Sequence, residues 1–514
     1  MGRFSGKYMM VSKTLLSGIL FLLHICFAYH AKAQFDFNTR CIHAYETILS
    51  LDFQSGKQLL DKEKNNNPGN LIPVFLENYI DFLTLSTGED PSDFQLLKPN
   101  RSQRIDKIKD VTAQSPWQRH CQAAIYLQWS FVRVKFGEYM MAGLDLNRAY
   151  RLLEENKTLY PGFVPDLLLS GVMDALIGSV PDNYKWVLKL ASMEGTIETG
   201  REKLYELIDV SETNPDWAHL KNEAFFYLSF IEMNLQSSKE YSHRLLQRMR
   251  LTDGMIEGPL TCYIIANLFM RTGENNSAIE TIQNCVIPEG SYRFHYLDFM
   301  LGTAKLNQLN PDAASHFLSF INNYRGGNYL KSAYQRLAWI SLLKNDLNAY
   351  RFYISKIPNT GQAFVDEDKQ ADKEASSNQI PNIGLLKARL LFDGGYYEEA
   401  IQILESDSIL HALPLQKDSV EYVYRKARIY HEWGKLTQAK DFYRQTVERG
   451  SNLPYFYAGN AALQLGLIFE NEDDYISAEY YFNQCLGLRF SEYRSSIQHK
   501  ARVGLQRIQT KKAG

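Results

Sequence analysis

The 514-residue sequence lacks the short motifs that carry the common kinds of catalysis. It contains no G-x-S-x-G nucleophile elbow, no H-E-x-x-H zinc helix and no G-x-x-x-x-G-K-S/T phosphate loop. The acidic run at residues 365–374 does not have the 12-residue pattern of a calcium-binding loop. We therefore expect no catalytic residue, no metal and no cofactor.

Cysteine is also scarce, with six in the chain and no C-x-x-C pair. His120-Cys121 and Cys41-x-His43 each lack two further metal ligands at a suitable spacing, so they are interpreted as structural residues. A disulfide across one helical hairpin is one possibility for Cys262 and Cys285. Buried free thiols are the favoured interpretation for every cysteine after residue 33, namely Cys41, Cys121, Cys262, Cys285 and Cys485.

A basic excess is lacking too. Four of the 56 Lys and Arg residues precede Gln34 and no acidic residue does, which leaves 52 basic and 58 acidic side chains in the rest of the chain. Nucleic-acid binding needs a basic footprint, so that class of partner is excluded. The mean hydropathy of −0.32 excludes a polytopic membrane protein.

The one long apolar stretch lies at the N-terminus and has the pattern of a secretory signal. Arg3, Lys7 and Lys13 precede an apolar run at residues 14–28, and Ala31-Lys32-Ala33 supplies small residues before Gln34. We predict a signal peptide at residues 1–33, and therefore an exported protein of the periplasm or outer membrane, with no membrane span after cleavage. An uncleaved anchor is the alternative; Ile25 before Cys26 argues against a lipoprotein signal.

What the chain does have is an internal repeat of 39 residues. Ala388, Ala427 and Gly466 are followed 12 residues later by Ala400, Ala439 and Ala478, and four residues later by Leu404, Tyr443 and Phe482. Looser copies with the same skeleton include Ala44-Gly56-Leu60, Ser130-Gly137-Ala142, Ala266-Gly273-Ala278 and Gly302-Ala314-Leu318. Small residues at these spacings let two helices cross closely. The pattern predicts an all-α fold of antiparallel helix pairs stacked into an α-solenoid.

These spacings resemble the tetratricopeptide repeat family, clearest in "KARLLFDGGYYEEAIQIL", "RKARIYHEWGKLTQAKDFY" and "QLGLIFENEDDYISAEYYF". The period of 39 rather than 34 departs from the family, as do Gly384, Val423 and Ala462 where Trp is common. The stretch "PYFYAGNAALQLGLIF" and residues 160–207 are similar to exported tetratricopeptide proteins of Bacteroidota-type bacteria. A weaker resemblance is to the inclusion-body-clearance and mitochondrial outer-membrane tetratricopeptide family.

Composition divides the chain into four parts. After residues 1–33, we expect an N-terminal helical-repeat array at 34–358, with an atypical segment near 160–207. A charged loop or linker is predicted at 359–382, because it has almost no apolar periodicity, and the C-terminal repeats follow at 383–514. In the atypical segment only Asp174, Asp182 and Lys185 could serve acid–base chemistry, and they are interpreted as surface residues.

The resemblance implies a concave groove lined by the first helix of each repeat. The groove positions of the family fall on residues that include Leu385, Phe392, Glu421, Leu463, Leu467 and Glu470, and the predicted partner-binding set is Asn382, Arg389, Tyr424, Arg428, His431 and Asn460. Arg389 and Arg428 occupy equivalent positions one repeat apart. Arginine suits carboxylate recognition, and tyrosine gives an amphipathic anchor. The alternative is that both arginines pair with Asp393 and Glu432 inside the array.

The predicted function is an exported scaffold that binds protein or peptide partners in the cell envelope, without catalysis. A glycan-binding protein of a surface uptake system is the alternative, because the chain is rich in aromatic residues, with 32 Tyr and 28 Phe.

Overall fold

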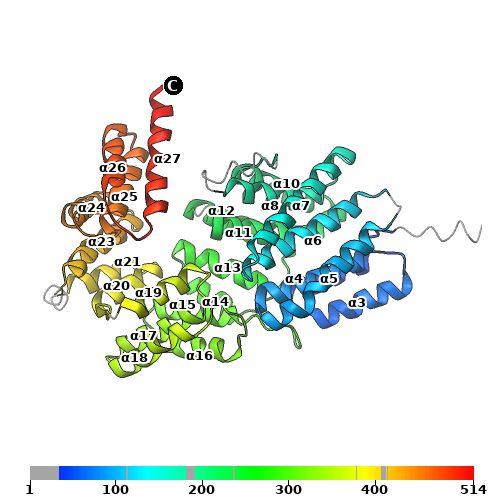
Figure 1. The fold of residues 1–514 in the computed structure, drawn as a ribbon, viewed down its shortest axis with the longest axis horizontal. Helices are drawn as coiled ribbons and strands as arrows, with labels where there is room; N and C mark the ends of the chain where they lie inside the picture. The colour runs from blue at the N-terminus through cyan, green and yellow to red at the C-terminus, as the bar shows by residue number, and fades with distance from the viewer. Residues whose placement is uncertain are drawn as a thin grey trace, which may run out of the picture. The chain divides into compact units, whose positions relative to one another are not determined.

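The computed structural model describes residues 34–111, 114–180, 192–235, 238–377, 379–406, 413 and 415–513. Throughout this part of the chain the secondary structure is helical and no strand occurs (Figure 1). The predicted all-α fold is confirmed. The predicted signal peptide lies outside the described residues. None of the described helices is long and apolar enough to cross a membrane.

The chain forms two compact units. Unit 1 comprises Met1–Ile264 and Cys285–Phe294, and unit 2 comprises Ile265–Asn284 and His295–Gly514. The helices that lie within unit 1 are α2 (Thr39–Leu49), α3 (Phe53–Asn66), α4 (Ile72–Gly88), α5 (Pro91–Lys109), α6 (Pro116–Lys135), α7 (Tyr139–Leu159), α8 (Asp166–Gly178), α10 (Ile197–Thr213), α11 (Lys221–Phe230) and α12 (Lys239–Leu251).

Helix α13 (Pro259–Thr272) begins in unit 1 and ends in unit 2. The other helices of unit 2 are α14 (Asn275–Gln283), α15 (Tyr296–Asn307), α16 (Ala313–Asn323), α17 (Leu330–Leu343), α18 (Leu347–Lys356), α19 (Asp366–Ser377), α20 (Ile383–Asp393), α21 (Tyr397–Glu405), α23 (Gln416–Glu432), α24 (Leu436–Gly450), α25 (Tyr457–Asn471), α26 (Tyr475–Gly487) and α27 (Arg494–Ala513).

The 39-residue repeats are the helix pairs α20–α21, α23–α24 and α25–α26, and the small residues lie where the two helices of a pair cross. Ala388, Ala400, Ala427, Ala439 and Ala478 are fully buried. A Cβ atom built on Gly466 would lie 2.5 Å from the ring of Phe482, so only glycine fits this crossing. Burial of these positions explains why small side chains recur at a fixed spacing.

One predicted register is wrong by one residue. In the pair α15–α16, Gly302 packs against Phe317, whose ring would lie 3.0 Å from a Cβ at Gly302. Phe317 is fully buried, as is Ala313, whereas Leu318 is 40% exposed. The interval from Gly302 to the buried alanine, Ala313, is therefore 11 residues rather than 12. The connection before α16 sets which residues of that helix are buried, and here the buried face begins one residue earlier than predicted.

The atypical segment contains a further close pair, α8–α10. A Cβ on Gly200 would lie 2.5 Å from the carbonyl oxygen of Gly171, so the two backbones are in contact at glycine. The expectation that Asp174 is a surface residue is wrong: it is buried and pairs with Lys203 at 2.6 Å. Asp182 and Lys185 lie outside the described residues.

The charged segment predicted as a loop or linker contains a helix, α19, and lies inside unit 2. Asp368 and Ala371 of this helix are fully buried. Its order comes from hydrogen bonds and ion pairs to α17, not from an apolar face. Apolar periodicity could not reveal it for that reason.

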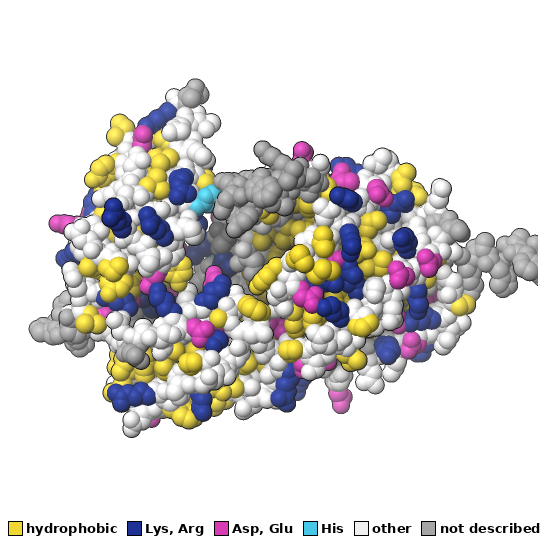
Figure 2. Space-filling model, in the orientation of Figure 1, with side chains coloured by type: hydrophobic (Ala, Val, Ile, Leu, Met, Phe, Trp, Pro, Cys, Tyr) yellow, Lys and Arg dark blue, Asp and Glu magenta, His cyan; other side chains and the backbone are white. Residues whose placement is uncertain are grey.

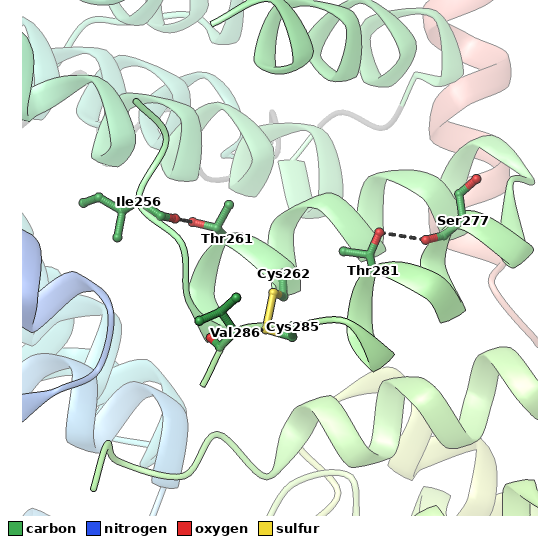
Figure 3. The surroundings of a disulfide bond; sticks show 7 residues. All are labelled: Ile256, Thr261, Cys262, Ser277, Thr281, Cys285 and Val286. Atoms are coloured by element: carbon green, nitrogen blue, oxygen red, sulfur yellow. Dashed lines mark hydrogen bonds between the residues drawn. A yellow bond between two sulfur atoms is a disulfide. The ribbon is translucent and has the colours of Figure 1, made fainter. Parts of the chain in front are cut away.

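Cys262 and Cys285 form a disulfide with a Cα–Cα distance of 6.0 Å (Figure 3). The favoured prediction of free thiols is wrong for this pair, because the chain returns after α14 to the start of α13. It holds for Cys41, Cys121 and Cys485, which are free and buried. Disulfides persist in oxidising compartments, so this bond bears on where the protein acts.

Replacing both cysteines of the disulfide with serine is expected to lower the free energy of unfolding by about 3 kcal/mol, because the bond closes a loop of intermediate length. Hydrogen-exchange mass spectrometry of α13 and of residues 285–294 would measure the change. Thiol counting on the unfolded, unreduced protein provides the control. Cys262 and Cys285 should be unreactive, and labelling of either one would contradict the disulfide.

Candidate binding groove

Unit 2 contains a groove of about 620 Å³ lined by side chains from several of its helices. The walls come from α17, α19, α20, α23 and the start of α25, and the rim comes from the connections that precede α25 and α27. The described part of the chain thus places the first helix of successive pairs around one hollow. The resemblance to tetratricopeptide repeats implies a groove of this kind.

Local helix geometry explains which residues face the groove. Ala388 and Ala427 are fully buried where they cross the second helix of their own pairs, and Ala388 also borders the groove. The next residue in each helix, Arg389 and Arg428, is turned by about 100° and lines the groove. Tyr424 lies one turn before Arg428 and also lines it.

Each groove arginine packs on an aromatic ring of the preceding first helix. The guanidinium of Arg389 lies 5.1 Å from the ring centroid of Trp339 in α17. The guanidinium of Arg428 lies 5.2 Å from the ring of Phe392 in α20 and donates to the hydroxyl of Tyr424 at 3.3 Å. Stacking holds both guanidinium groups in defined positions.

The predicted pairing of these arginines with acidic neighbours is present but long. Arg389 Nε lies 3.7 Å from Asp393, and Arg428 Nη2 lies 3.9 Å from Glu432. The arginine side chains remain 35% and 31% exposed. Although burial opposes it, the hydroxyls of Tyr424 and Tyr443 and the carboxylate of Glu432 raise the pKa of Arg428, so it stays charged.

The groove also contains a second cluster of charged and polar side chains, which the sequence predicted only in part. Arg425 Nε donates to Glu421 at 2.8 Å, and the hydroxyl of Tyr457 donates to the same carboxylate at 2.7 Å. Burial acts to raise the pKa of Glu421, but Arg425 and Tyr457 hold it below its usual value. Glu421 was expected at a groove position, whereas Arg425 and Tyr457 were missed.

The predicted residues do not all contribute side chains in the same way. Asn382 lines the groove, but its Oδ1 accepts from the backbone N–H groups of Gly384 at 3.0 Å and Leu385 at 3.1 Å, so it caps α20. Asn460 also lines the groove, and its Oδ1 accepts from Gln464 at 3.4 Å.

His431 is not among the residues that line the groove. Its Nδ1 lies 3.1 Å from the hydroxyl of Tyr443, a fully buried side chain of the second helix. The last turn of α23 therefore directs this histidine into its own helix pair. The remaining expected positions divide similarly: Leu385 and Phe392 line the groove, and Leu463, Leu467 and Glu470 do not.

Sequence reasoning also missed an aromatic rim on the groove. Tyr455, Phe456 and Tyr493 lie in the connections before α25 and α27 and line its edge. The rings of Phe456 and Tyr493 are in edge-to-face contact, 5.3 Å between centroids. The run Tyr455-Phe456-Tyr457 was the available signal, but the repeat pattern assigned no role to connections.

The charges of the groove balance. Its lining includes five basic and five acidic side chains, namely Lys373, Arg389, Lys417, Arg425 and Arg428, and Glu374, Asp393, Asp418, Glu421 and Glu492. On the molecular face in Figure 2, basic and acidic side chains are likewise interspersed. No group of three or more metal-ligating side chains occurs among the described residues. The groove therefore suits a ligand with apolar and charged groups together.

A family model described as a tetratricopeptide repeat matches residues 420–449. This segment is similar to a tetratricopeptide repeat. The matched residues cover most of α23 and nearly all of α24, so this repeat supplies Glu421, Tyr424, Arg425 and Arg428 to the groove. None of the curated proteins matches the chain. Tetratricopeptide repeats are typical of helical scaffolds for protein interaction.

Proposed function

We propose that unit 2 is a scaffold that binds a peptide segment of a partner protein in the groove, without catalysis. The observation that carries this proposal is the pair Arg389 and Arg428. They occupy equivalent positions in adjacent repeats, each is stacked on a ring of the first helix of the preceding pair, and each is about one third exposed in the groove.

The stacked arginines suit a segment with two carboxylates. Stacking occupies the face of a guanidinium and directs its N–H groups outward in the plane, where a carboxylate can accept two hydrogen bonds. Arg428 uses one N–H for the hydroxyl of Tyr424 and has others for a ligand. Asp393 and Glu432 are too distant to satisfy the guanidinium groups fully. Phe392 and Tyr424 supply apolar contact next to the charges. The partner class that fits is a segment with acidic and apolar residues.

We further propose that the protein acts outside the cytoplasm, in the cell envelope. The signal-like pattern before Gln34 supports export. The disulfide between Cys262 and Cys285 is consistent with an oxidising compartment. Fractionation of cells that express the full chain would test this, and recovery of the protein with residues 1–33 attached in the cytoplasm would contradict it.

Photo-crosslinking tests the groove directly. With p-benzoylphenylalanine at position 392, we expect a reproducible cross-linked partner in intact cells, and with the same group at position 480 we expect none. Phe392 lines the groove, whereas Tyr480 is an exposed residue of α26 outside it. Equal cross-linking at both positions would contradict the proposal.

Substitution of the arginines gives the quantitative prediction. Arg389→Ala and Arg428→Ala should each raise the Kd for the cross-linked segment about tenfold, because each removes a charge-assisted hydrogen bond. Fluorescence anisotropy with a labelled peptide of that segment measures the effect. Arg444→Ala is the matched control, because Arg444 lies in the second helix α24, outside the groove, and donates to Asp441 at 2.9 Å and to the hydroxyl of Tyr481 at 3.4 Å. Its Kd should be unchanged.

A glycan ligand is the second candidate, favoured by the aromatic rim of Tyr455, Phe456 and Tyr493. Aromatic rings offer stacking surfaces for the apolar faces of sugars. Saturable binding on a glycan array that is lost in Tyr493→Ala, with no peptide bound at position 392, would favour the glycan over the peptide.

A further inference from the structure

Helix α19 is fixed to α17 by buried polar contacts. The carboxylate of Asp368 accepts from the backbone N–H groups of Tyr329 at 2.5 Å and Ser332 at 2.9 Å, at the N-terminus of α17. Lys331 Nζ donates to Asp372 at 2.8 Å. A carboxylate at a helix N-terminus accepts hydrogen bonds from the free N–H groups there and interacts favourably with the helix dipole. This face of α19 is thus firmly attached to α17 by buried polar contacts.

Glu374 strengthens the same attachment from inside the groove. It accepts from Gln335 Nε2 at 2.7 Å, from Trp339 Nε1 at 3.0 Å and from the hydroxyl of Tyr350 at 3.2 Å. Three donors from α17 and α18 therefore converge on one carboxylate. Removing α19 from this surface would leave several of them without a partner, which is costly.

Among the described residues, two polar contacts join the opposite face of α19 to residues 492–493. Gln370 Nε2 donates to the hydroxyl of Tyr493 at 2.9 Å, and Lys373 forms an ion pair with Glu492. Each contact joins residues more than one hundred positions apart. All four residues line the groove, and Lys373 is 61% exposed. Exposed pairs of this kind are weak and are screened by salt.

Tyr493 connects these contacts to the arginine site. Its backbone has φ +55°, in the left-handed region, where non-glycine residues cost energy unless their surroundings hold them. Burial and the carboxylate of Glu492 raise the pKa of Tyr493, and the guanidinium of Arg389 acts in the opposite direction. Tyr493, Glu492 and Arg389 all line the same groove, so the contact between α19 and residues 492–493 borders the space that Arg389 faces.

We propose that the contacts Gln370–Tyr493 and Lys373–Glu492 are a clasp that closes the mouth of the groove, and that a partner segment loads when this clasp opens. The clasp is the weaker side of α19, since the other side carries the buried carboxylates Asp368 and Glu374. Opening therefore separates residues 492–493 from α19 and leaves α19 on α17. This inference rests on the proposed function of the groove and concerns the regulation of that site.

Distance measurements between spin labels test the clasp in the absence of any partner. Labels at Lys369→Cys in α19 and Ser495→Cys in α27 span it, and both positions are exposed. Labels at Lys369→Cys and Asn348→Cys, the latter exposed in α18, span the fixed side. The free cysteines Cys41, Cys121 and Cys485 are buried and stay unlabelled in the folded protein.

Charge reversal supplies the perturbation. Lys373→Glu should raise the population of longer 369–495 distances about fivefold, and the 369–348 distance should not change. Combining Lys373→Glu with Glu492→Lys restores an ion pair of opposite polarity and should restore the short distance. An unchanged 369–495 distance in Lys373→Glu would overturn the clasp, as would failure of the double variant to restore it.

The two proposals fail separately. The spin-label distances are measured without ligand, so they decide the clasp whatever the groove binds. Cross-linking at position 392 decides the groove, whatever the clasp does. A clasp that opens on charge reversal, together with no partner at position 392, would remove only the peptide function.

Discussion

Asp145→Ala is expected to lower the local free energy of unfolding of unit 1 by about 3–5 kcal/mol, because it leaves buried arginines without a counter-charge. Asp145 lies in α7 and is fully buried. It pairs with Arg101 of α5, and its Oδ2 lies 3.1 Å from Arg133 Nη1 of α6. The carboxylate therefore joins three helices.

The arginines have little alternative compensation. Arg133 is only 4% exposed, and its Nε lies 3.7 Å from Glu138. Arg101 also packs on the ring of Tyr126, 4.8 Å from its centroid. Once Asp145 is removed, two positive charges remain close together in a poorly solvated site. Repulsion then adds to the cost of burial.

Hydrogen-exchange mass spectrometry of peptides from α5, α6 and α7 would measure this effect, because it gives local free energies in a chain with two units. Glu240→Ala is the matched control. It removes an ion pair to Arg244 that is exposed on α12, at 3.0 Å, and should cost no more than about 0.5 kcal/mol. Equal effects of the two substitutions would contradict the account of Asp145.

Phe482→Ala is expected to cost about 3–5 kcal/mol of local stability in the last repeat of unit 2, the usual cost of truncating a buried phenylalanine. The ring of Phe482 lies between two glycines. Cβ atoms built on Gly466 of α25 and on Gly504 of α27 would each lie 2.5 Å from it. Loss of the ring opens a cavity where three helices meet.

Exchange of the amides in α25, α26 and α27 would report this change. Tyr480→Ala is the control in the same helix, because Tyr480 is 61% exposed, and it should change local stability by less than about 0.5 kcal/mol. Faster exchange confined to α26 would show that Phe482 does not hold α25 and α27 together, contrary to the prediction.

The helix crossings could be predicted from the sequence because they depend on residue size at a fixed spacing. The positions of Ala388, Ala427 and Gly466 at the crossings can be predicted without knowledge of the rest of the fold. The Gly302 pair was placed one residue out, since the length of a turn sets which face of the next helix is buried. Periodicity alone does not contain that information.

Features that depend on distant polar partners could not be predicted. In the sequence, Asp145 looks like an exposed residue on a helix. In the structure it pairs with Arg101 of α5 and Arg133 of α6, which are distant in the sequence. Helix α19 lacks an apolar face, and its order depends on the N-terminus of α17, 36 to 39 positions earlier. Repeat positions placed Arg389, Tyr424 and Arg428 in the groove correctly. The same rule failed for His431, because Tyr443 provides it with a partner in its own helix pair.

Each groove arginine stacks on a ring that belongs to the first helix of the preceding pair. The residues that fold together as one repeat are therefore not the same set as the residues that form one arginine site. The family match covers residues 420–449, which include Arg428 but not Phe392, the ring beneath it. A single repeat thus supplies the arginine but not the aromatic ring on which the arginine stacks. The proposed binding surface is therefore formed at the junction between neighbouring repeats. We expect its specificity to change when the order of repeats changes, even if every repeat keeps its sequence.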